Sequence, residues 1–285
     1  MSAGFRLGSL ILAVSLLLQG CSFATRFAYN HLDWLANREL AKYVDLSEAQ
    51  EQWLEPRFQR FWDWHRNTQL PLYVTDLRQL MGAVERGLTA DDLLAANARM
   101  EQHWINASEA LRGDAIALLR QLDDAQVAQL LKRVDAKNQE FIDERLTITD
   151  QERIEQDRER ARKWFDKRLG SVSLAQRESI EQWLSKRLDL SDQWQARRQW
   201  WRTAFADALA RRDQAGSADE LATLLLDSRS SWSESLRKQV EINQQLWLDL
   251  TLEIERQASD RQRRHLLEYL GELAEDFEAL AAQSR

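Results

Sequence analysis

The chain has 285 residues and a formal net charge of −7 at pH 7. An acidic balance of this size disfavours nonspecific binding to nucleic acid or to anionic lipid surfaces. Because the chain has one cysteine, an internal disulfide is excluded and packing must stabilise the fold.

The first 20 residues have the pattern of an export signal. Arg6 precedes an uncharged apolar run over residues 7–18, and the small residue Gly20 follows. A basic start, a short apolar core and a small residue at the cleavage point define a secretory signal peptide. The run is shorter than the roughly 20 residues that a membrane-spanning helix needs. We therefore expect residues 1–20 to be removed from the mature protein.

Leu18-Gln19-Gly20-Cys21 resembles the bacterial lipobox, in which the cysteine receives a diacylglycerol before cleavage. The resemblance implies that Cys21 is lipidated and that its acyl chains, palmitate among them, hold the protein to a membrane. Ser22 stands where an aspartate would retain the protein in the inner membrane. The resemblance therefore implies the periplasmic face of the outer membrane of a Gram-negative bacterium. The alternative is an ordinary signal peptide with an incidental cysteine.

Residues 21–41 form an aromatic segment next to this expected anchor. Its rings belong to Phe23, Phe27, Tyr29, His31 and Trp34. Aromatic side chains are enriched at membrane interfaces, so the segment could lie against lipid headgroups. It could equally form the first packed helix of the domain.

The rest of the chain predicts an all-α fold of long antiparallel helices in an elongated bundle. It is rich in Leu, Ala, Arg, Glu and Gln, and only two prolines and a few glycines interrupt it. Apolar residues recur at helical spacing, as at Leu236, Val240 and Trp247. Pro56 and Pro71 should kink or interrupt their helix. Helix ends are expected at Gly87, Gly170 and Gly216.

One short pattern occurs four times: an apolar residue, Ser or Asp, two variable residues and Gln. In a capping box the Ser or Asp oxygen accepts a bond from the backbone N–H three residues later, and the Gln side chain bonds back. The four boxes therefore predict four helix starts. Their capping residues are Ser47 with Gln50, Asp123 with Gln126, Ser173 with Gln176, and Ser259 with Gln262.

The repeats also predict an ancient duplication. Gln52-Trp53-Leu54 follows the first box, and Gln182-Trp183-Leu184 follows the third. We assign one half to residues 42–169 and the other to residues 170–285, each of roughly three helices. Because long helices bury their apolar faces only against neighbours, we expect one continuous domain over residues 22–285.

The apolar-Ser/Thr-x-x-Gln boxes resemble the LTxxQ signature of the Spy and CpxP family of periplasmic stress proteins. That resemblance implies a curved, cradle-like helical fold and a chaperone that binds unfolded clients without ATP. As a whole, the chain is similar to a family of proteobacterial lipoproteins with a lipobox, an aromatic segment and repeated glutamine boxes. This second resemblance implies location and fold and brings no activity.

No motif of a known enzyme chemistry is present in the sequence. None of the four histidines has a second histidine at the i, i+4 spacing of a helical zinc site. There is no nucleophile elbow, phosphate-binding loop or dinucleotide fingerprint. We therefore expect no metal, no cofactor and no catalytic residue. Paired carboxylates that hydrolyse a glycan remain possible, because acidic residues are abundant.

Twelve tryptophans are the chain's most unusual compositional feature. One cluster follows a helical face and contains Trp194, Arg198, Trp201 and Phe205. These side chains could fill interfaces between helices. Alternatively, they could line a surface that binds apolar segments of client proteins, with the neighbouring arginines contacting carboxylates or aromatic rings.

These observations favour a non-enzymatic, protein-binding lipoprotein that acts as an envelope chaperone or scaffold. Its expected partners are the membrane, through the acyl chains, and unfolded or envelope proteins, but not nucleic acid. The alternative is an enzyme, or an activator of an enzyme, that acts on peptidoglycan.

Overall fold

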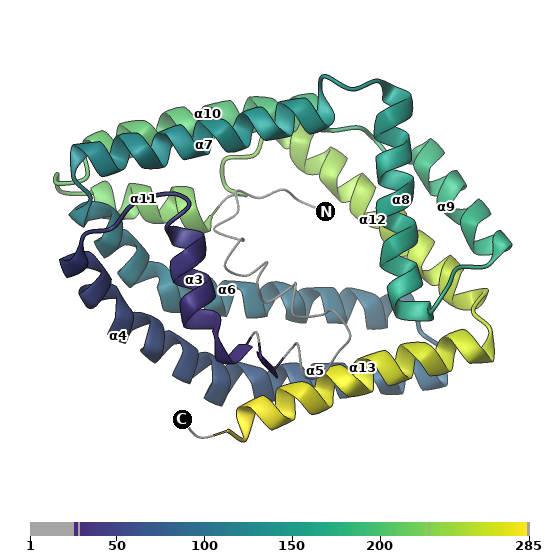
Figure 1. The fold of residues 1–285 in the computed structure, drawn as a ribbon. Coiled ribbons are helices and arrows are strands. Elements are labelled where there is room, and N and C mark those ends of the chain that lie inside the picture. Colours follow the sequence, from purple (N-terminus) through teal and green to yellow (C-terminus); the bar gives the residue numbers. More distant parts are fainter. Residues whose placement is uncertain (1–25, 28, 228, 284–285) are drawn as a thin grey trace. The chain divides into compact units, whose positions relative to one another are not determined.

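The computed structural model describes residues 26–27, 29–227 and 229–283 (Figure 1). Every regular element in this part of the chain is a helix, which confirms the all-α prediction. No helix among these residues is long and apolar enough to span a bilayer. Cys21 and residues 1–20 lie outside the described residues.

The helices follow one another along the chain as α3 (Leu32–Leu40), α4 (Glu48–Trp64), the π-helix η1 (His65–Gln69), α5 (Leu70–Arg86), α6 (Ala90–Gln121), α7 (Asp124–Arg145), α8 (Asp150–Leu169), α9 (Leu174–Lys186), α10 (Ser191–Ala210), α11 (Ser217–Leu226), α12 (Glu234–Arg256) and α13 (Asp260–Ala281).

The chain divides into two compact units. Unit 1 consists of the described residues up to Leu70 together with Gln102–Asp143 and Asp192–Trp232. Unit 2 consists of Pro71–Glu101, Glu144–Ser191 and the described residues from Ser233 onward. The division therefore differs from the expected single domain with halves at residues 42–169 and 170–285, because each unit takes segments from both halves. The duplication itself stays a prediction.

The four capping boxes each open a helix. Ser47, Ser173 and Ser259 cap α4, α9 and α13, with both reciprocal bonds present in each box. Before α7, the Gln126 N–H donates to Asp123 Oδ1 at 2.8 Å, and the Asp123 N–H donates to Gln126 Oε1 at 3.0 Å. These bonds satisfy N–H groups that the first turn of a helix leaves without helical partners.

Pro71 and Gly170 mark helix interruptions, whereas Pro56 lies inside α4 and does not interrupt it. The π-helix η1 separates α4 from α5 and ends two residues before Pro71. Proline has no N–H to donate to the carbonyl four residues earlier. The wider π-helical turn before Pro71 is consistent with that missing hydrogen bond. At Gly170, φ is 79° where α8 ends, a left-handed value that glycine adopts without steric penalty.

Unit 1 has its core between α7, α10 and α11. Helices α7 and α10 lie side by side in Figure 1, and Arg202 of α10 forms a two-bond ion pair with Asp135 of α7 at 2.7 and 2.8 Å. Hydrogen bonds from Arg202 lower the pKa of Asp135. The core contains Val44, Leu122, Val127, Leu130, Val134, Trp201, Phe205, Ala208, Leu209, Leu221 and Leu224.

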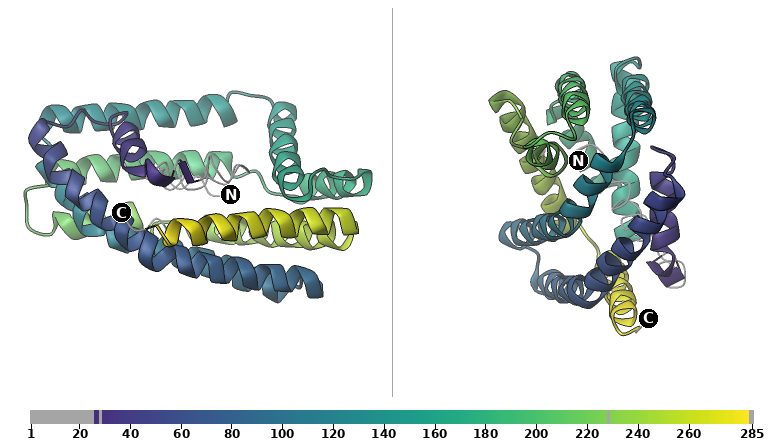
Figure 2. Two further views of the ribbon diagram at one scale, coloured as in Figure 1. Left: turned by 60° about the horizontal axis from the view of Figure 1, so that its bottom comes forward. Right: turned by 90° about the vertical axis from the view of Figure 1, so that its left-hand side faces the viewer.

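Unit 2 is built on α8, α9, α12 and α13, which pack in the pairs α8–α9, α9–α12 and α8–α13. A hydrophobic core cluster of this unit contains Ala161, Phe165, Leu169, Val172, Ile180, Leu184, Leu250 and Ile254. Helix α13 also runs along α5 (Figures 1 and 2), where Arg78 pairs with Glu278 at 2.6 Å and Tyr73 contacts Phe277.

A buried carboxylate in unit 2 binds two arginines that lie at the ends of other helices. Asp157 of α8 accepts two bonds from Arg145 at 2.9 and 3.0 Å and pairs with Arg187 at 2.7 Å. Arg145 ends α7, and Arg187 is the C-cap of α9. Asp157 is therefore buried although most of its neighbours in the sequence of α8 are charged.

Candidate functional site

The predicted cluster on α10 divides between the core and the surface. Trp201 and Phe205 are 3% and 2% exposed, and their rings stack with centroids 4.5 Å apart. Trp201 Nε1 also donates to the carbonyl oxygen of Leu224 in α11 at 2.7 Å. Their burial inside unit 1 favours the interpretation that these two residues fill an interface between helices over the alternative that they contact clients.

Arg198 belongs to the same interface. Its guanidinium lies 4.5 Å from the centroid of the Phe141 ring, and Nη1 donates to Asn138 Oδ1 at 3.3 Å. Both partners are on α7. Arg198 therefore contributes to packing between α10 and α7. Its contacts favour this structural role over the alternative role in client binding.

A second set of unit 1 side chains, from α10 and from the segment before α12, is partly or fully exposed. Trp194 meets Trp232 edge to face, with ring centroids 5.3 Å apart. The Arg197 guanidinium lies 4.7 Å from the centroid of the Trp200 ring, and Trp200 is 49% exposed. Arg229 lies 5.9 Å from the Trp232 ring. These five residues of unit 1 are named the Trp–Arg surface from here on.

The chemistry of the Trp–Arg surface is that of an adaptable binding face. Its indole rings offer apolar area with few rotatable bonds, and its guanidinium groups can bind carboxylates or further rings. Burial lowers the pKa of Arg197, and that group nevertheless remains charged near neutral pH. The surface thus combines apolar contact with positive charge in an otherwise acidic protein.

The capping-box glutamines form one pair in each unit. In unit 1, Gln50 Nε2 donates to Gln126 Oε1 at 3.0 Å, and Gln126 Nε2 donates back to Gln50 Oε1 at 2.7 Å. In unit 2, Gln176 and Gln262 exchange the same two bonds at 3.4 and 2.8 Å. Each pair joins the starts of two helices. The side-chain amides of these glutamines therefore have a structural role, because they bond to each other within each unit.

Three more tryptophans cluster in unit 2. The Trp247 ring lies 5.4 Å from the Trp164 ring and 5.3 Å from the Trp183 ring. All three rings are partly buried and pack against the core of this unit. Arg168 lies 3.7 Å from the Trp164 centroid. Edge-to-face packing fills the space between these rings, so the cluster is part of the core boundary.

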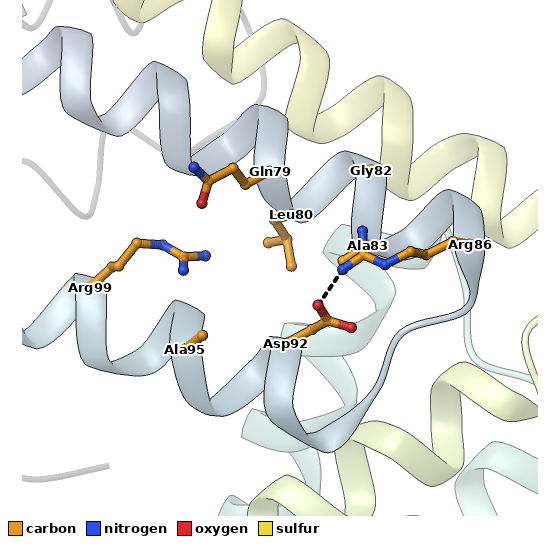
Figure 3. Close-up of a pocket in the computed structure, with 8 residues that line it drawn as sticks. All are labelled: Gln79, Leu80, Gly82, Ala83, Arg86, Asp92, Ala95 and Arg99. Carbon is orange, nitrogen blue, oxygen red and sulfur yellow. Dashed lines mark hydrogen bonds and ion pairs between the residues drawn. The ribbon is translucent and has the colours of Figure 1, made fainter.

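A groove of about 320 Å³ lies between α5 and the start of α6 in unit 2 (Figure 3). Small residues leave this space open, namely Gly82, Ala83 and Ala95. Arg86 and Arg99 border it, and each is paired with a carboxylate: Arg86 with Asp92, and Arg99 with Asp76 at 2.9 Å. The pairing leaves no unbalanced charge at these two arginines for a charged ligand.

His65 lies in a buried polar centre of unit 1. Tyr29 Oη and His65 Nδ1 are 2.8 Å apart, and Arg66 Nη2 donates to Asn30 Oδ1 at 3.1 Å. Burial, and then the positive charges of His103 and Arg66, lower the pKa of His65 to about 4. The imidazole is therefore neutral at neutral pH and serves as a hydrogen-bonding group that holds the N-terminal segment.

The described residues contain no group of three or more His, Cys, Asp or Glu side chains arranged to hold a metal ion. Residues 42–237 match the model of a protein family whose description is "family of unknown function (DUF6279)". No curated protein and no solved structure matches the chain significantly. The matched range begins after the segment that contains Cys21.

Proposed function

Because the chain belongs to this family of unknown function, we propose its role from its own geometry: a non-enzymatic lipoprotein that binds other proteins at the periplasmic face of the outer membrane. It acts there as an envelope chaperone or scaffold. The Trp–Arg surface of unit 1 is the observation that carries this proposal.

Three properties of the Trp–Arg surface support protein binding. Trp200 is half exposed, so its indole ring offers apolar area and an N–H group to a partner. Tryptophan and arginine are the side chains that most often dominate the energy of protein interfaces. The edge-to-face contact of Trp194 with Trp232 fixes both rings, so less side-chain entropy is lost when a partner binds.

The lipid anchor is proposed on the sequence Leu18-Gln19-Gly20-Cys21 and on the absence of any other cysteine from the chain. The likeness of the glutamine boxes to the Spy and CpxP signature supports the chaperone version. In each unit the two paired glutamines open two helices, as the boxes of that signature do by resemblance.

An aggregation assay tests the proposal. The chain without residues 1–21 is expected to suppress aggregation of an unfolded model protein in the absence of ATP. Trp194→Ala with Trp200→Ala should raise the concentration needed for half suppression several-fold, because both substitutions remove apolar contact area. Trp104→Ala is the matched control, since it removes an exposed tryptophan of α6 that lies outside the Trp–Arg surface.

Two results would contradict the proposal at different points. No suppression by the unsubstituted chain at several-fold excess would remove the chaperone version. If the control and the double variant suppress aggregation equally well, the chaperone activity stands but the Trp–Arg surface is not its site.

A further inference from the structure

The N-terminal helical segment exposes a second aromatic face. Phe27 and Trp34 are 55% and 57% exposed, and His31 and Arg38 are exposed as well. The Phe27 and His31 rings lie 4.2 Å apart, and the Arg38 guanidinium lies 5.3 Å from the Trp34 centroid. His31, Trp34 and Arg38 follow one another at helical spacing. These four residues are named the α3 face.

The other side of this segment fixes the direction of the α3 face. Tyr29, Leu32 and Ala36 are buried in unit 1. Tyr29 Oη is 2.8 Å from His65 Nδ1. Because these contacts hold one side of the segment against the unit, the side with Phe27 and Trp34 is directed away from the core.

The expected anchor limits how far the α3 face can be from a membrane. Phe27 follows Cys21 by six positions in the sequence. A chain of this length spans at most about 20 Å when fully extended, at about 3.5 Å per residue. This step rests on the lipidation of Cys21 that is proposed above.

The side chains of the α3 face are those that favour the headgroup layer of a bilayer. Tryptophan and phenylalanine rings bury apolar area at this depth, and tryptophan keeps its N–H among polar groups. Arginine places its aliphatic stem beside apolar surface and its charge beside phosphate groups. The acyl chains supply the anchor itself, and an amphipathic surface beside them adds contact with the headgroup layer.

We propose that the α3 face lies on the phospholipid headgroup layer beside the lipidated cysteine. It adds a second membrane contact to the acyl chains and restricts the rotation of unit 1 about its tether. The occupant of this face is therefore the bilayer and not a client protein.

Site-specific quenching tests this placement in the mature lipidated protein. The protein is reconstituted into vesicles of phosphatidylethanolamine and phosphatidylglycerol that contain a lipid with a nitroxide at headgroup depth. A fluorescent label is attached through Asn37→Cys, an exposed position of α3, or through Thr203→Cys, an exposed position of α10. The thiol of Cys21 is blocked by its own diacylglycerol, so the label reacts only with the introduced cysteine.

The lipid should quench the label at position 37 several-fold more than the label at position 203. Phe27→Ser with Trp34→Ser should abolish that difference, while the protein stays acylated by mass spectrometry and bound to the vesicles. Equal quenching at the two positions, or quenching that the double substitution leaves unchanged, would overturn the proposal. Protection of the position-37 label by an added client, without quenching by lipid, would overturn it and assign the face to a protein.

The outcome is separable from that of the proposed function. The double substitution at Phe27 and Trp34 should leave aggregation suppression by the acyl-free chain unchanged, since neither residue belongs to the Trp–Arg surface. An unmodified Cys21 in the mass spectrum would overturn the anchor and the α3 placement together, whereas a vesicle result alone concerns only the α3 face.

Discussion

His65 shows how a single buried group links the N-terminal segment to unit 1. Its ring is 3% exposed and lies 2.8 Å from the Tyr29 hydroxyl, so a neutral imidazole suits the site. Protonation would place a positive charge in a dry environment close to Arg66 and His103. Folding therefore opposes proton uptake at this residue.

The stability of unit 1 should fall in mild acid for this reason. The pKa of His65 is about 4 in the folded protein and 6.5 when the residue is solvated, so the unfolded chain binds the extra proton between these values. Above pH 6.5 the imidazole is neutral in both the folded and the unfolded chain, so this residue costs no stability. As the pH falls toward 4, the unfolded chain takes up the proton first and the free energy of unfolding decreases, by about 3 kcal/mol near pH 4.

Urea unfolding of the acyl-free chain across this pH range measures the effect. His65→Gln keeps an acceptor for the Tyr29 hydroxyl and cannot be protonated, so its stability should depend less steeply on pH than that of the unsubstituted chain. Parallel pH profiles for the two proteins would show that His65 does not contribute in this way.

At the scale of elements, the glutamine pairs explain why the same short box recurs. The side chain of Gln176 is 0% exposed, and its Oε1 accepts from the Ser173 N–H at 2.8 Å. Its Nε2 donates to the Ile254 carbonyl at 3.1 Å, at the end of α12, and also to Gln262. One amide therefore caps α9 and joins it to α12 and α13.

Removal of this amide should destabilise unit 2 much more than an ordinary surface change. Gln176→Ala leaves the Ser173 N–H, the buried Ile254 carbonyl and the buried Gln262 amide without that partner, at a cost of about 2–3 kcal/mol. Gln182→Ala is the matched control, because it makes the same substitution at an exposed position of α9. Similar urea midpoints for the two variants would contradict the role assigned to the pair.

Local patterns predicted the element starts well, and contacts between distant residues escaped prediction. A capping box is complete within four residues, so Ser47 and Gln50 are legible from sequence alone. The exchange of bonds between Gln50 and Gln126 joins residues 76 positions apart, and no local pattern encodes it. The duplication predicted related boxes without predicting which box would meet which.

The α10 helix shows the same limit for the binding surface. Its apolar spacing identified Trp201 and Phe205 as one stripe, and spacing alone does not tell whether a stripe faces a core or a partner. Trp200 is next to Trp201 in sequence, yet a helix turns by about 100° per residue and places the two rings on different faces. The buried Asp157 was missed similarly, because its charged neighbours conceal its one buried side.

For the whole molecule, we propose a lipid anchor and two aromatic surfaces of unit 1 that have different occupants. The α3 face is assigned to the bilayer because of its short distance in sequence from Cys21. The Trp–Arg surface lies on α10 and on Arg229 and Trp232, more than 170 positions after Cys21, and is assigned to proteins. An acyl anchor would keep such a binding surface concentrated at the membrane where its partners are made or assembled.

Photocrosslinking in living cells tests the protein-binding claim most directly. A photoreactive residue is placed at Trp200, at the buried Phe205 or at the exposed Trp104, and adducts are resolved by mass after irradiation. We expect protein adducts from position 200 and none from position 205. An unfolded envelope client should reduce the yield of the adducts from position 200, because it occupies the same surface. Adducts that are absent from position 200, or that form equally from position 104, would contradict the protein-binding claim.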